Sequence, residues 1–557
     1  MIEISSISCD IRHYSQIRSQ EDAWVRGQAC KLLHIQTGEI DQFEIMRKSH
    51  DARHKDRISV LWRIRLSLLA GKEQELACVT RAKDLTSNKA LRINYCEPVP
   101  EPVYPAHTSK KPDVPPVIVG AGCAGLFAAL TLAHKGLCPI LVERGEEAKA
   151  RASSIKRFIE HAQLDENSNI QFGAGGAGTF SDGKLGTGTK SPLHRLILKT
   201  FVSAGAQPHI LYDAKPHIGS DILPRVVTHI VAEIERLGGR VLFSHKMTRL
   251  EIQNGRVCGV YIEDCGAHSL TKGCERSIKT RHVILAQGHS ARDTLLMLKD
   301  VGVYMERKTF AMGVRIEHLQ EAIDQAQYKY SARARVLGAA DYKAAVHLPN
   351  GRSAFSFCMC PGGYVVAATS ARERVVTNGM SLSTRAGKNA NAGFLSNVLP
   401  QDLPGDDVLA GMYLQDRCEK KAFELGGEDY KAPAQLVGDF IQNKASTQAG
   451  RVSPSYSLGV KFGSIYSCLP AYITDTLAQA LPLIARKLAG FDAQDAVLTA
   501  CETRSSSPVR LTRDEHLQAI GIEGLWPAGE GAGYAGGIMS AATDGIRAAQ
   551  ALIESME

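Results

Sequence analysis

The sequence contains no uninterrupted apolar run of about 18 residues, so we expect no helix that spans a membrane. Its first residues, MIEISSISCDIRHYSQ, lack a basic start followed by an apolar stretch, so we expect no signal peptide. Internal repeats and low-complexity tracts are absent as well. Without a secretion signal, the fourteen cysteines are expected to be free thiols. These absences predict a cytoplasmic globular protein of about three or four domains with no membrane partner.

A large excess of one charge is also lacking. The net charge of +8 is small for 557 residues, and it permits an anionic substrate or nucleic acid without arguing for either. The N-terminal region has no aromatic-rich RNA-recognition motif. Basic residues do gather around residues 43–54, which we predict to be helical, and we interpret them as a solvated face. These residues are Arg47, Lys48, Arg53, His54, Lys55 and Arg57.

What the sequence does contain is a dinucleotide-binding pattern at residues 116–145. A short apolar run, a G-x-G-x-x-G turn, an apolar helix and a second apolar run follow one another, which predicts a β-α-β unit. Gly120 allows the tight turn, Gly122 lets the backbone approach a pyrophosphate, and Gly125 lets the helix pack closely on the strand. Glu143 ends the second run, roughly twenty residues on, where an acid takes a ribose hydroxyl.

Two more glycine-rich stretches and one strand complete the predicted cofactor site. Residues 169–185, NIQFGAGGAGTFSDGKL, leave little side chain between the backbone and a ligand. Residues 283–288 are predicted to return to the nucleotide sheet beside the cofactor. Residues 524–549 combine a strand, an acid between glycines and a helix start, which suits the flavin end of FAD.

The convergence of these stretches selects FAD as the resident cofactor. A second unit of strand, G-x-G-x-x-G turn and helix is absent, so a nicotinamide donor, NAD(P)H, would visit only transiently. The predicted cofactor-binding residues are Gly120, Gly122, Gly125, Glu143, Arg144, Gly175, Gly176, Asp182, Met247, Gly288, Gly529, Glu530, Gly537 and Ile538.

The predicted fold is α/β, with a single Rossmann-type FAD-binding domain, an inserted mixed α+β substrate or cap domain and a small N-terminal α/β domain. Within it we predict strands at residues 31–35 and 59–69, strand-turn-strand at 353–369, and mainly helical segments at 406–444 and 471–503. The domain boundaries that we predict are 1–96 for the N-terminal domain, 97–116 for a proline-rich linker, 117–300 and 504–557 for the FAD-binding domain, and 301–503 for the insertion.

Several sequence blocks together resemble a known bacterial family. They are DARHKDRISV, VIVGAGCAGLFAAL, NIQFGAGGAGTFSDGKL, KPHIGSDIL, FAMGVRIEH, FSFCMCPGGYVV, ETRSSSPVRLTRD and PAGEGAGYAGGIMSAATDGI. The chain is similar to the FAD-dependent dehydrogenases, or NAD(P)/FAD-dependent oxidoreductases, that carry a small N-terminal domain. This resemblance implies a single-Rossmann FAD fold with an inserted domain, and it does not supply a substrate.

Four residues of the insertion are candidates for catalysis. Cys358 and Cys360 should share one face of a strand, where they could form a redox dithiol, half of a metal site, or two small buried residues. Arg315 and His318 are candidates for anchoring an anionic substrate and for proton transfer. Cys265, His268 and Cys274 lie near one another, but a fourth ligand is lacking, so we expect no metal site.

These patterns predict an FAD-dependent oxidoreductase, a dehydrogenase or reductase, that acts on a small molecule by flavin-mediated hydride transfer. The alternative is a flavoprotein that binds or acts on RNA through its basic N-terminal domain.

Overall fold

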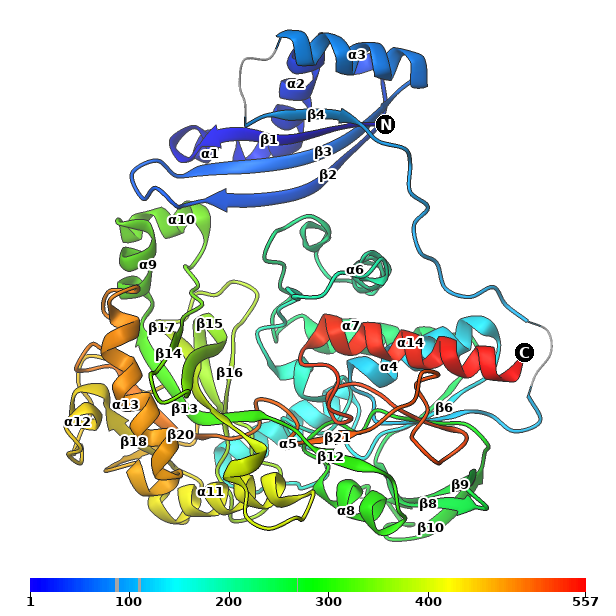
Figure 1. Ribbon diagram of the computed structural model, residues 1–557, viewed down its shortest axis with the longest axis vertical. Coiled ribbons are helices and arrows are strands. Elements are labelled where there is room, and N and C mark those ends of the chain that lie inside the picture. The colour runs from blue at the N-terminus through cyan, green and yellow to red at the C-terminus, as the bar shows by residue number, and fades with distance from the viewer. Residues whose placement is uncertain (86–89, 109–111, 268) are drawn as a thin grey trace. The chain divides into compact units, whose positions relative to one another are not determined.

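The computed structural model describes residues 1–85, 90–108, 112–267 and 269–557, and the chain forms two compact units (Figure 1). The first unit consists of Met1–Pro102, Gln207–Pro216 and Asp324–Ala340. The second unit consists of Val103–Ala206, His217–Ile323 and Asp341–Glu557. Two segments far along the sequence therefore belong to the N-terminal unit.

The first unit is a small α/β fold. Its helices and strands are β1 (Ile2–Asp10), α1 (Ile11–Ile17), α2 (Glu21–Leu33), β2 (Ile40–Asp51), β3 (Ser59–Leu68), α3 (Lys72–Leu85), β4 (Arg92–Tyr95) and α10 (Ala334–Leu337). The antiparallel sheet has the order β2-β3-β1-β4. Alternate residues of β3, including Trp62 and Ile64, are buried, as period-two patterning requires of a sheet with one covered face. Figure 1 shows α2 and α3 on one side of this sheet.

Two predictions for this unit are wrong. Residues 43–54 are not helical, because β2 pairs with β3 along its length, with Phe43 opposite Leu66 and Ile45 opposite Ile64. Residues 31–35 are not a strand, because they end α2, and His34 takes the left-handed C-cap conformation. In both places pairing and packing across the unit outweigh the local preference.

The second unit contains a parallel sheet in the order β22-β11-β5-β6-β7, which is the predicted Rossmann-type core. The strands and their helices are β5 (Val117–Val119), α4 (Cys123–Lys135), β6 (Ile140–Val142), α5 (Ala148–His161), α6 (Leu193–Ser203), α7 (Leu223–Arg236), β7 (Arg240–Leu242), β11 (Val283–Leu285), α8 (Arg292–Asp300), β22 (Leu525–Pro527) and α14 (Ile538–Met556). Helices α4 and α14 pack so closely that a Cβ at Gly545 would overlap with the backbone of Ala124.

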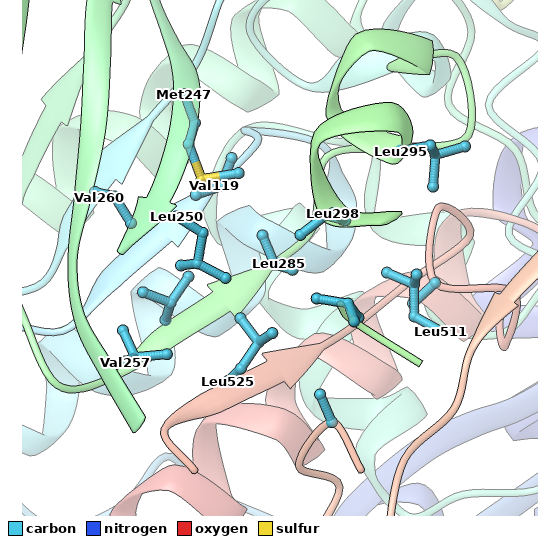
Figure 2. Packing of buried hydrophobic residues seen from close by; sticks show 14 of the residues in the cluster. Val119, Met247, Leu250, Val257, Val260, Leu285, Leu295, Leu298, Leu511 and Leu525 are labelled. Atoms are coloured by element: carbon cyan, nitrogen blue, oxygen red, sulfur yellow. The ribbon is translucent and has the colours of Figure 1, made fainter. Parts of the chain in front are cut away.

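An antiparallel meander lies against this sheet. It consists of β8 (His245–Gln253), β9 (Arg256–Asp264) and β10 (Glu275–Lys279), and Asn254 and Gly255 form the predicted hairpin turn with positive φ angles. Figure 2 shows Met247 and Leu250 of the meander beside Val119 and Leu285 of the parallel sheet. This shared core holds the strand ends of the parallel sheet in place.

The inserted region builds its own sheet. It has the order β14-β15-β17-β13-β20-β18-β19, with β16 paired to β15. Its elements, with a short β12–β21 pair, are β12 (Met305–Arg307), β13 (Phe310–Leu319), α9 (Gln320–Tyr328), β14 (Ala345–His347), β15 (Ser353–Ala367), β16 (Thr377–Met380), β17 (Asn389–Val398), α11 (Ala410–Gly426), β18 (Ala432–Leu436), α12 (Val437–Ile441), β19 (Val460–Phe462), α13 (Ala471–Ala485), β20 (Val497–Glu502) and β21 (Val509–Leu511).

Two expectations for this region need correction. Residues 353–367 form the single long strand β15 with bulges around Cys360, in place of the predicted two strands joined by a turn over 353–369. Residues 471–503 are helical only to Ala485, because the buried residues Val497–Glu502 pair with β13. Residues 406–444 are mainly helical, as predicted, in α11 and α12, which the strand β18 separates.

The predicted fold class is confirmed, with a Rossmann-type parallel sheet, additional antiparallel sheets and a small N-terminal unit. Within the described residues, no helix combines the length and the apolar character needed to cross a membrane.

Candidate cofactor and active site

The candidate site is a cavity of about 350 Å³ in the second unit. Its wall includes residues that directly follow β5, β6, β11 and β22, among them Gly120, Glu143, Gln287 and Gly529. The carboxyl ends of parallel strands are where open α/β sheets bind their ligands. The parallel sheet therefore positions this cavity.

The glycine turn after β5 is shaped by three different constraints. Gly120 has φ +100°, and a Cβ there would overlap with the Ala286 carbonyl. A Cβ at Gly125 would overlap with the Gly120 carbonyl oxygen, so α4 can approach β5 only with glycine here. Gly122 lines the cavity, and a Cβ there would meet no protein atom within 4 Å. The open space beside Gly122 and the N-terminus of α4 fit a pyrophosphate.

Glu143 fastens three backbone segments around the cavity. Its Oε2 accepts a hydrogen bond from the Ala121 N–H at 2.7 Å. Its Oε1 accepts from the N–H groups of Gly145 and Gly173 at 2.9 and 2.8 Å. The carboxylate is nearly buried yet lines the cavity, where a ribose hydroxyl could reach it. The neighbouring Arg144 also lines the cavity and pairs with Asp293 at 2.8 Å.

The loop at residues 169–185 is held from behind by a buried arginine. Arg151 of α5 donates hydrogen bonds to four carbonyls, those of Asn169, Ile170, Ala174 and Gly176, at 2.7–2.9 Å. Burial lowers the pKa of Arg151 to about 9. The loop reaches the glycine turn, since Gly175 forms a bridge with Gly122. Sequence reasoning missed Arg151, because it is one charged residue among several in a charged helix.

Asp182 lies at the far end of this loop and lines the cavity. Its carboxylate is paired with the guanidinium of Arg385, and its Oδ2 lies 4.0 Å from the Lys184 Nζ. Lys184 Nζ is buried and makes no hydrogen bond among the described residues. The carboxylate is thus occupied by Arg385 and Lys184, and Lys184 itself lines the cavity.

Glu530 follows β22 and faces the same cavity. Its Oε2 lies 3.7 Å from the Nδ1 of His289, and its side chain is 28% exposed. Burial raises the pKa of Glu530 to about 8, although Lys308 acts in the opposite direction. Burial, assisted by the charge of Arg504, lowers the pKa of His289 to about 4. Both side chains are therefore mainly neutral near pH 7.

Two cavity residues were missed by the sequence analysis. His289 directly follows the strand and glycine at residues 283–288, and that position was an available signal. Arg504 comes shortly after β20 and is held by Glu419 at 2.7 Å. Burial acts to raise the pKa of Glu419, but Arg504 and Arg292 lower it to about 2.

Cys358 and Cys360 lie on the bulged part of β15. Cys358 lines the cavity beside Phe357 and has φ +41°, whereas Cys360 is fully buried. The Cys360 thiol contacts the Cys358 carbonyl oxygen at 3.2 Å. The guanidinium of Arg315 donates to that same oxygen at 2.7 Å and lies 3.4 Å from the Cys360 Sγ.

The structure does not bring Arg315 or His318 to the cavity wall. Arg315 is fully buried and forms an ion pair with Glu502 at 2.9 Å, so its charge is already matched inside the protein. His318 is also buried, with its Nε2 2.9 Å from the Phe491 carbonyl oxygen. Neither the anchoring of a substrate nor proton transfer is therefore supported by their placement.

Most of the other predicted residues do come together. Those that line the cavity are Gly120, Gly122, Glu143, Arg144, Gly175, Gly176, Asp182, Met247, Gly288, Cys358, Gly529, Glu530, Gly537 and Ile538. Gly125 lies behind the wall, where it permits close packing. Of the residues considered as metal ligands, Cys265 donates to the Glu263 carbonyl at 3.6 Å, and His268 lies outside the described residues.

A Rossmann-type sheet with this glycine turn, this acid and a second helix N-terminus at Gly537 defines the class of FAD-dependent oxidoreductases. Family models agree with this assignment. Residues 115–340 match the pyridine nucleotide-disulphide oxidoreductases, residues 309–505 match an FAD-dependent protein, C-terminal domain-like, and residues 1–67 match a domain of unknown function.

A protein of Clostridium beijerinckii, described as an uncharacterized protein, is 41% identical over 529 residues and is covered to 95%, as is this chain. The chain belongs to this family of FAD-dependent oxidoreductases, which confirms the resemblance inferred from the sequence blocks. Digeranylgeranylglycerophospholipid reductase 1 of Methanococcoides burtonii is 22% identical over 357 residues, which are 63% of this chain and 73% of that protein. Among solved structures, a triple mutant of a flavin-dependent brominase has a TM-score of 0.37 and 12% identity, and the match covers 79% of this chain and 80% of the brominase chain. This similarity is too remote to inform function.

Proposed function

We propose that the protein is a dehydrogenase or reductase that binds FAD in the cavity and transfers hydride to or from a small molecule. The observation that supports this most strongly is the composition of the cavity wall. One part consists of the glycine turn and Glu143, which suit a dinucleotide, and another consists of Glu530 and the start of α14, which suit a flavin ring.

The residues at the cavity wall suit the parts of FAD. Gly122 and the first N–H groups of α4 would hold the pyrophosphate, and Glu143 would hold a ribose. The N-terminus of α14, beginning at Ile538, would face the pyrimidine part of the ring system, where its positive dipole end favours developing negative charge. When bound, FAD supplies two-electron hydride chemistry.

The chain's own polar groups then define the reacting end of the site. Glu530 holds a proton near neutral pH, because burial raises its pKa to about 8. His289 beside it is unprotonated, and its Nε2 has no hydrogen-bond partner among the described residues. Lys184 supplies a positive charge at the cavity wall. This set can orient a polar small molecule and exchange one proton with it.

The electron donor that we propose is NAD(P)H, bound transiently. The described residues contain one parallel sheet with a dinucleotide-binding turn, so a resident nicotinamide site of the same kind has no second sheet to occupy. The donor would therefore reach the flavin through the cavity itself.

The RNA-binding alternative gains less support. Lys48 pairs with Glu21 at 2.6 Å, Arg53 pairs with Asp51 at 2.6 Å, and Lys55 donates to the Ala326 carbonyl. Part of the basic cluster is thus neutralised within the first unit. A binding site for RNA phosphates would need these charges to be free.

Identification of the released cofactor and its reduction test the proposal. The purified protein should release FAD on heating, and anaerobic NADH or NADPH should bleach the visible absorption of the oxidised flavin. Release of FMN, or of no flavin, would contradict the assignment. Bleaching that requires added RNA would favour the alternative.

A further inference from the structure

We propose that Cys358 and Cys360 form a redox-active dithiol that stores two electrons beside the flavin and closes reversibly to a disulfide. This inference rests on the proposed binding of FAD in the same cavity. It adds a second redox centre, built from the inserted sheet, to a site that the Rossmann-type sheet otherwise defines.

The backbone geometry of β15 suits a bond between these two residues. In an extended strand, residues two apart have Cα atoms about 6.6 Å apart, near the upper limit of about 6.8 Å for a disulfide. Cys358 departs from the extended conformation with φ +41°, and the pairing register with β17 shifts between Phe357 and Cys360. The bulge bends the strand at these two residues, so their spacing is not fixed at that of a regular extended strand.

The two cysteines already interact. The Cys360 S–H donates a hydrogen bond to the Cys358 carbonyl oxygen at 3.2 Å, which holds its sulfur beside the backbone of Cys358. The presence of the Cys360 thiol lowers the pKa of the Cys358 thiol to about 5, and the pKa of the Cys360 thiol is raised. Burial opposes the charged form of Cys358, while the positive charges of Lys184 and Arg315 favour it. A thiolate with a thiol next to it is the reactive arrangement for disulfide formation.

Another cysteine in the same cavity shows the contrast. Cys123 also lines the cavity, but burial raises its pKa to about 12, and no cation lowers it. It is a small neutral side chain at the start of α4. The difference between Cys123 and Cys358 comes from the partner thiol, Lys184 and Arg315.

Arg315 acts here as a positioning residue. It is fixed by Glu502 at 2.9 Å and by Asn391 at 2.9 Å, and its remaining donor holds the Cys358 carbonyl at 2.7 Å. This contact holds the backbone of the bulge in place. Without these partners, the charged side chain of Arg315 would not be stable in a fully buried position.

The step balances without a further reagent. The Cys358 thiolate and the Cys360 thiol lose two electrons and the proton of the Cys360 S–H bond as the sulfur–sulfur bond forms. The oxidised flavin, which is the electron acceptor, takes up the same two electrons and one proton. In the reverse direction, the reduced flavin reopens the disulfide.

Reductive titration of the oxidised holoenzyme under anaerobic conditions tests this proposal. With dithionite, the wild-type protein should take up about four electrons per bound FAD, two for the flavin and two for the disulfide. The variants Cys358→Ser and Cys360→Ser should each take up about two. Cys258→Ser, which alters a partly exposed cysteine of β9, should still take up about four.

Differential alkylation gives a second readout that does not depend on catalysis. When the oxidised protein is denatured without reduction, both Cys358 and Cys360 should escape alkylation, and both should react once the denatured protein is also reduced. Normalising each variant to its bound FAD separates a loss of the dithiol from a loss of folding.

The outcomes distinguish the two proposals. Uptake of about two electrons by wild-type protein that contains FAD, with both thiols alkylated, would overturn the dithiol and leave the proposed function standing. Absence of FAD from the folded protein would overturn both.

Discussion

The two ends of the cavity are formed by different kinds of chemical group. The nucleotide end consists of backbone, with Gly120 and Gly122 leaving room and Glu143 fastening three turns by their N–H groups. The reacting end consists of side chains, namely Cys358, Lys184 and Glu530, from three distant segments. The difference separates affinity, which depends on space and free N–H groups, from chemistry, which depends on charges and protons.

The largest expected effect comes from a substitution that blocks only the nucleotide end of the cavity. Gly122→Val should weaken FAD binding by about 1,000-fold or more, because the new side chain occupies the open space beside the turn. The fold should persist with a loss of about 1 kcal/mol, since Gly122 is only the N-cap of α4 and has an ordinary φ of −73°. Flavin content and the thermal midpoint of unfolding measure the two effects.

Cys123→Ser is the matched control for that variant. Its side chain also lines the cavity, but a serine fills nearly the same space, so flavin content should remain close to that of the wild type. Equal flavin content in Gly122→Val and wild type would show that the pyrophosphate lies elsewhere.

The second effect concerns the buried ion pair between Arg315 and Glu502, which lies behind the reacting end of the cavity. Arg315→Ala should lower the free energy of unfolding by about 3 kcal/mol, because it leaves the buried Glu502 without its partner. Burial already raises the pKa of Glu502 to about 7 even though Arg315 acts to lower it, so the Glu502 carboxylate is costly to bury even with its partner present. Urea unfolding of apoprotein measures the loss.

Arg315→Lys should recover part of that stability, since it keeps the charge but not the planar fork that reaches Asn391 and Cys358. An unchanged unfolding free energy in Arg315→Ala would show that the ion pair with Glu502 does not stabilise the fold.

A smaller effect is expected at Glu530. Its carboxyl is mainly protonated at pH 7, so its hydrogen bonds to a cofactor are those of a neutral group, worth about 0.5–1.5 kcal/mol. Glu530→Ala should therefore weaken FAD binding by about tenfold or less. Glu530→Gln should bind nearly as well as the wild type, because the amide is also neutral and has both donor and acceptor. Fluorescence titration of apoprotein with FAD gives these affinities, and a loss of about 100-fold in Glu530→Ala would mean that the carboxyl is ionised.

A further expected effect is a pH dependence of the stability of the apoprotein. The pKa of Glu530 is about 8 in the folded protein and 4.5 for the free side chain, so the folded state holds a proton that the unfolded chain releases. Stability from this group is full below pH 4.5 and declines as pH rises toward about 8. The apoprotein of Glu530→Gln should lose less stability than wild type over this interval in parallel thermal unfolding series. Identical slopes in the two series would show that Glu530 titrates normally.

The nucleotide end could be predicted from the sequence because that end is local. Gly120, Gly122 and Gly125 act within one turn, and the strands on either side are short apolar runs. The reacting end could be predicted only in part, since the interaction of Lys184 with Cys358 depends on how the inserted sheet meets the loop at residues 169–185. Arg315 and His318 were misleading because a strand that is buried on both faces carries its polar residues inward as well.

The same distinction explains the errors in the first unit. Residues 43–54 have a mixed pattern that fits helix or strand, and only the ladder with β3 decides between them. The segments Gln207–Pro216 and Asp324–Ala340 carry no local sign that they belong with the N-terminus.

Those two segments have a consequence for biosynthesis. The backbone N–H of Lys48 in β2 donates to the Tyr212 carbonyl at 2.7 Å, and the Lys48 carbonyl accepts from the Ala214 N–H at 2.8 Å. In the same unit, the Arg333 guanidinium donates a hydrogen bond to the Lys55 carbonyl. A ribosome that has released only the N-terminal segment, Met1–Pro102, has therefore not yet supplied all the segments that this unit uses. The N-terminal unit reaches its final set of contacts only after Ala340 has emerged, when more than half of the 557 residues have been translated.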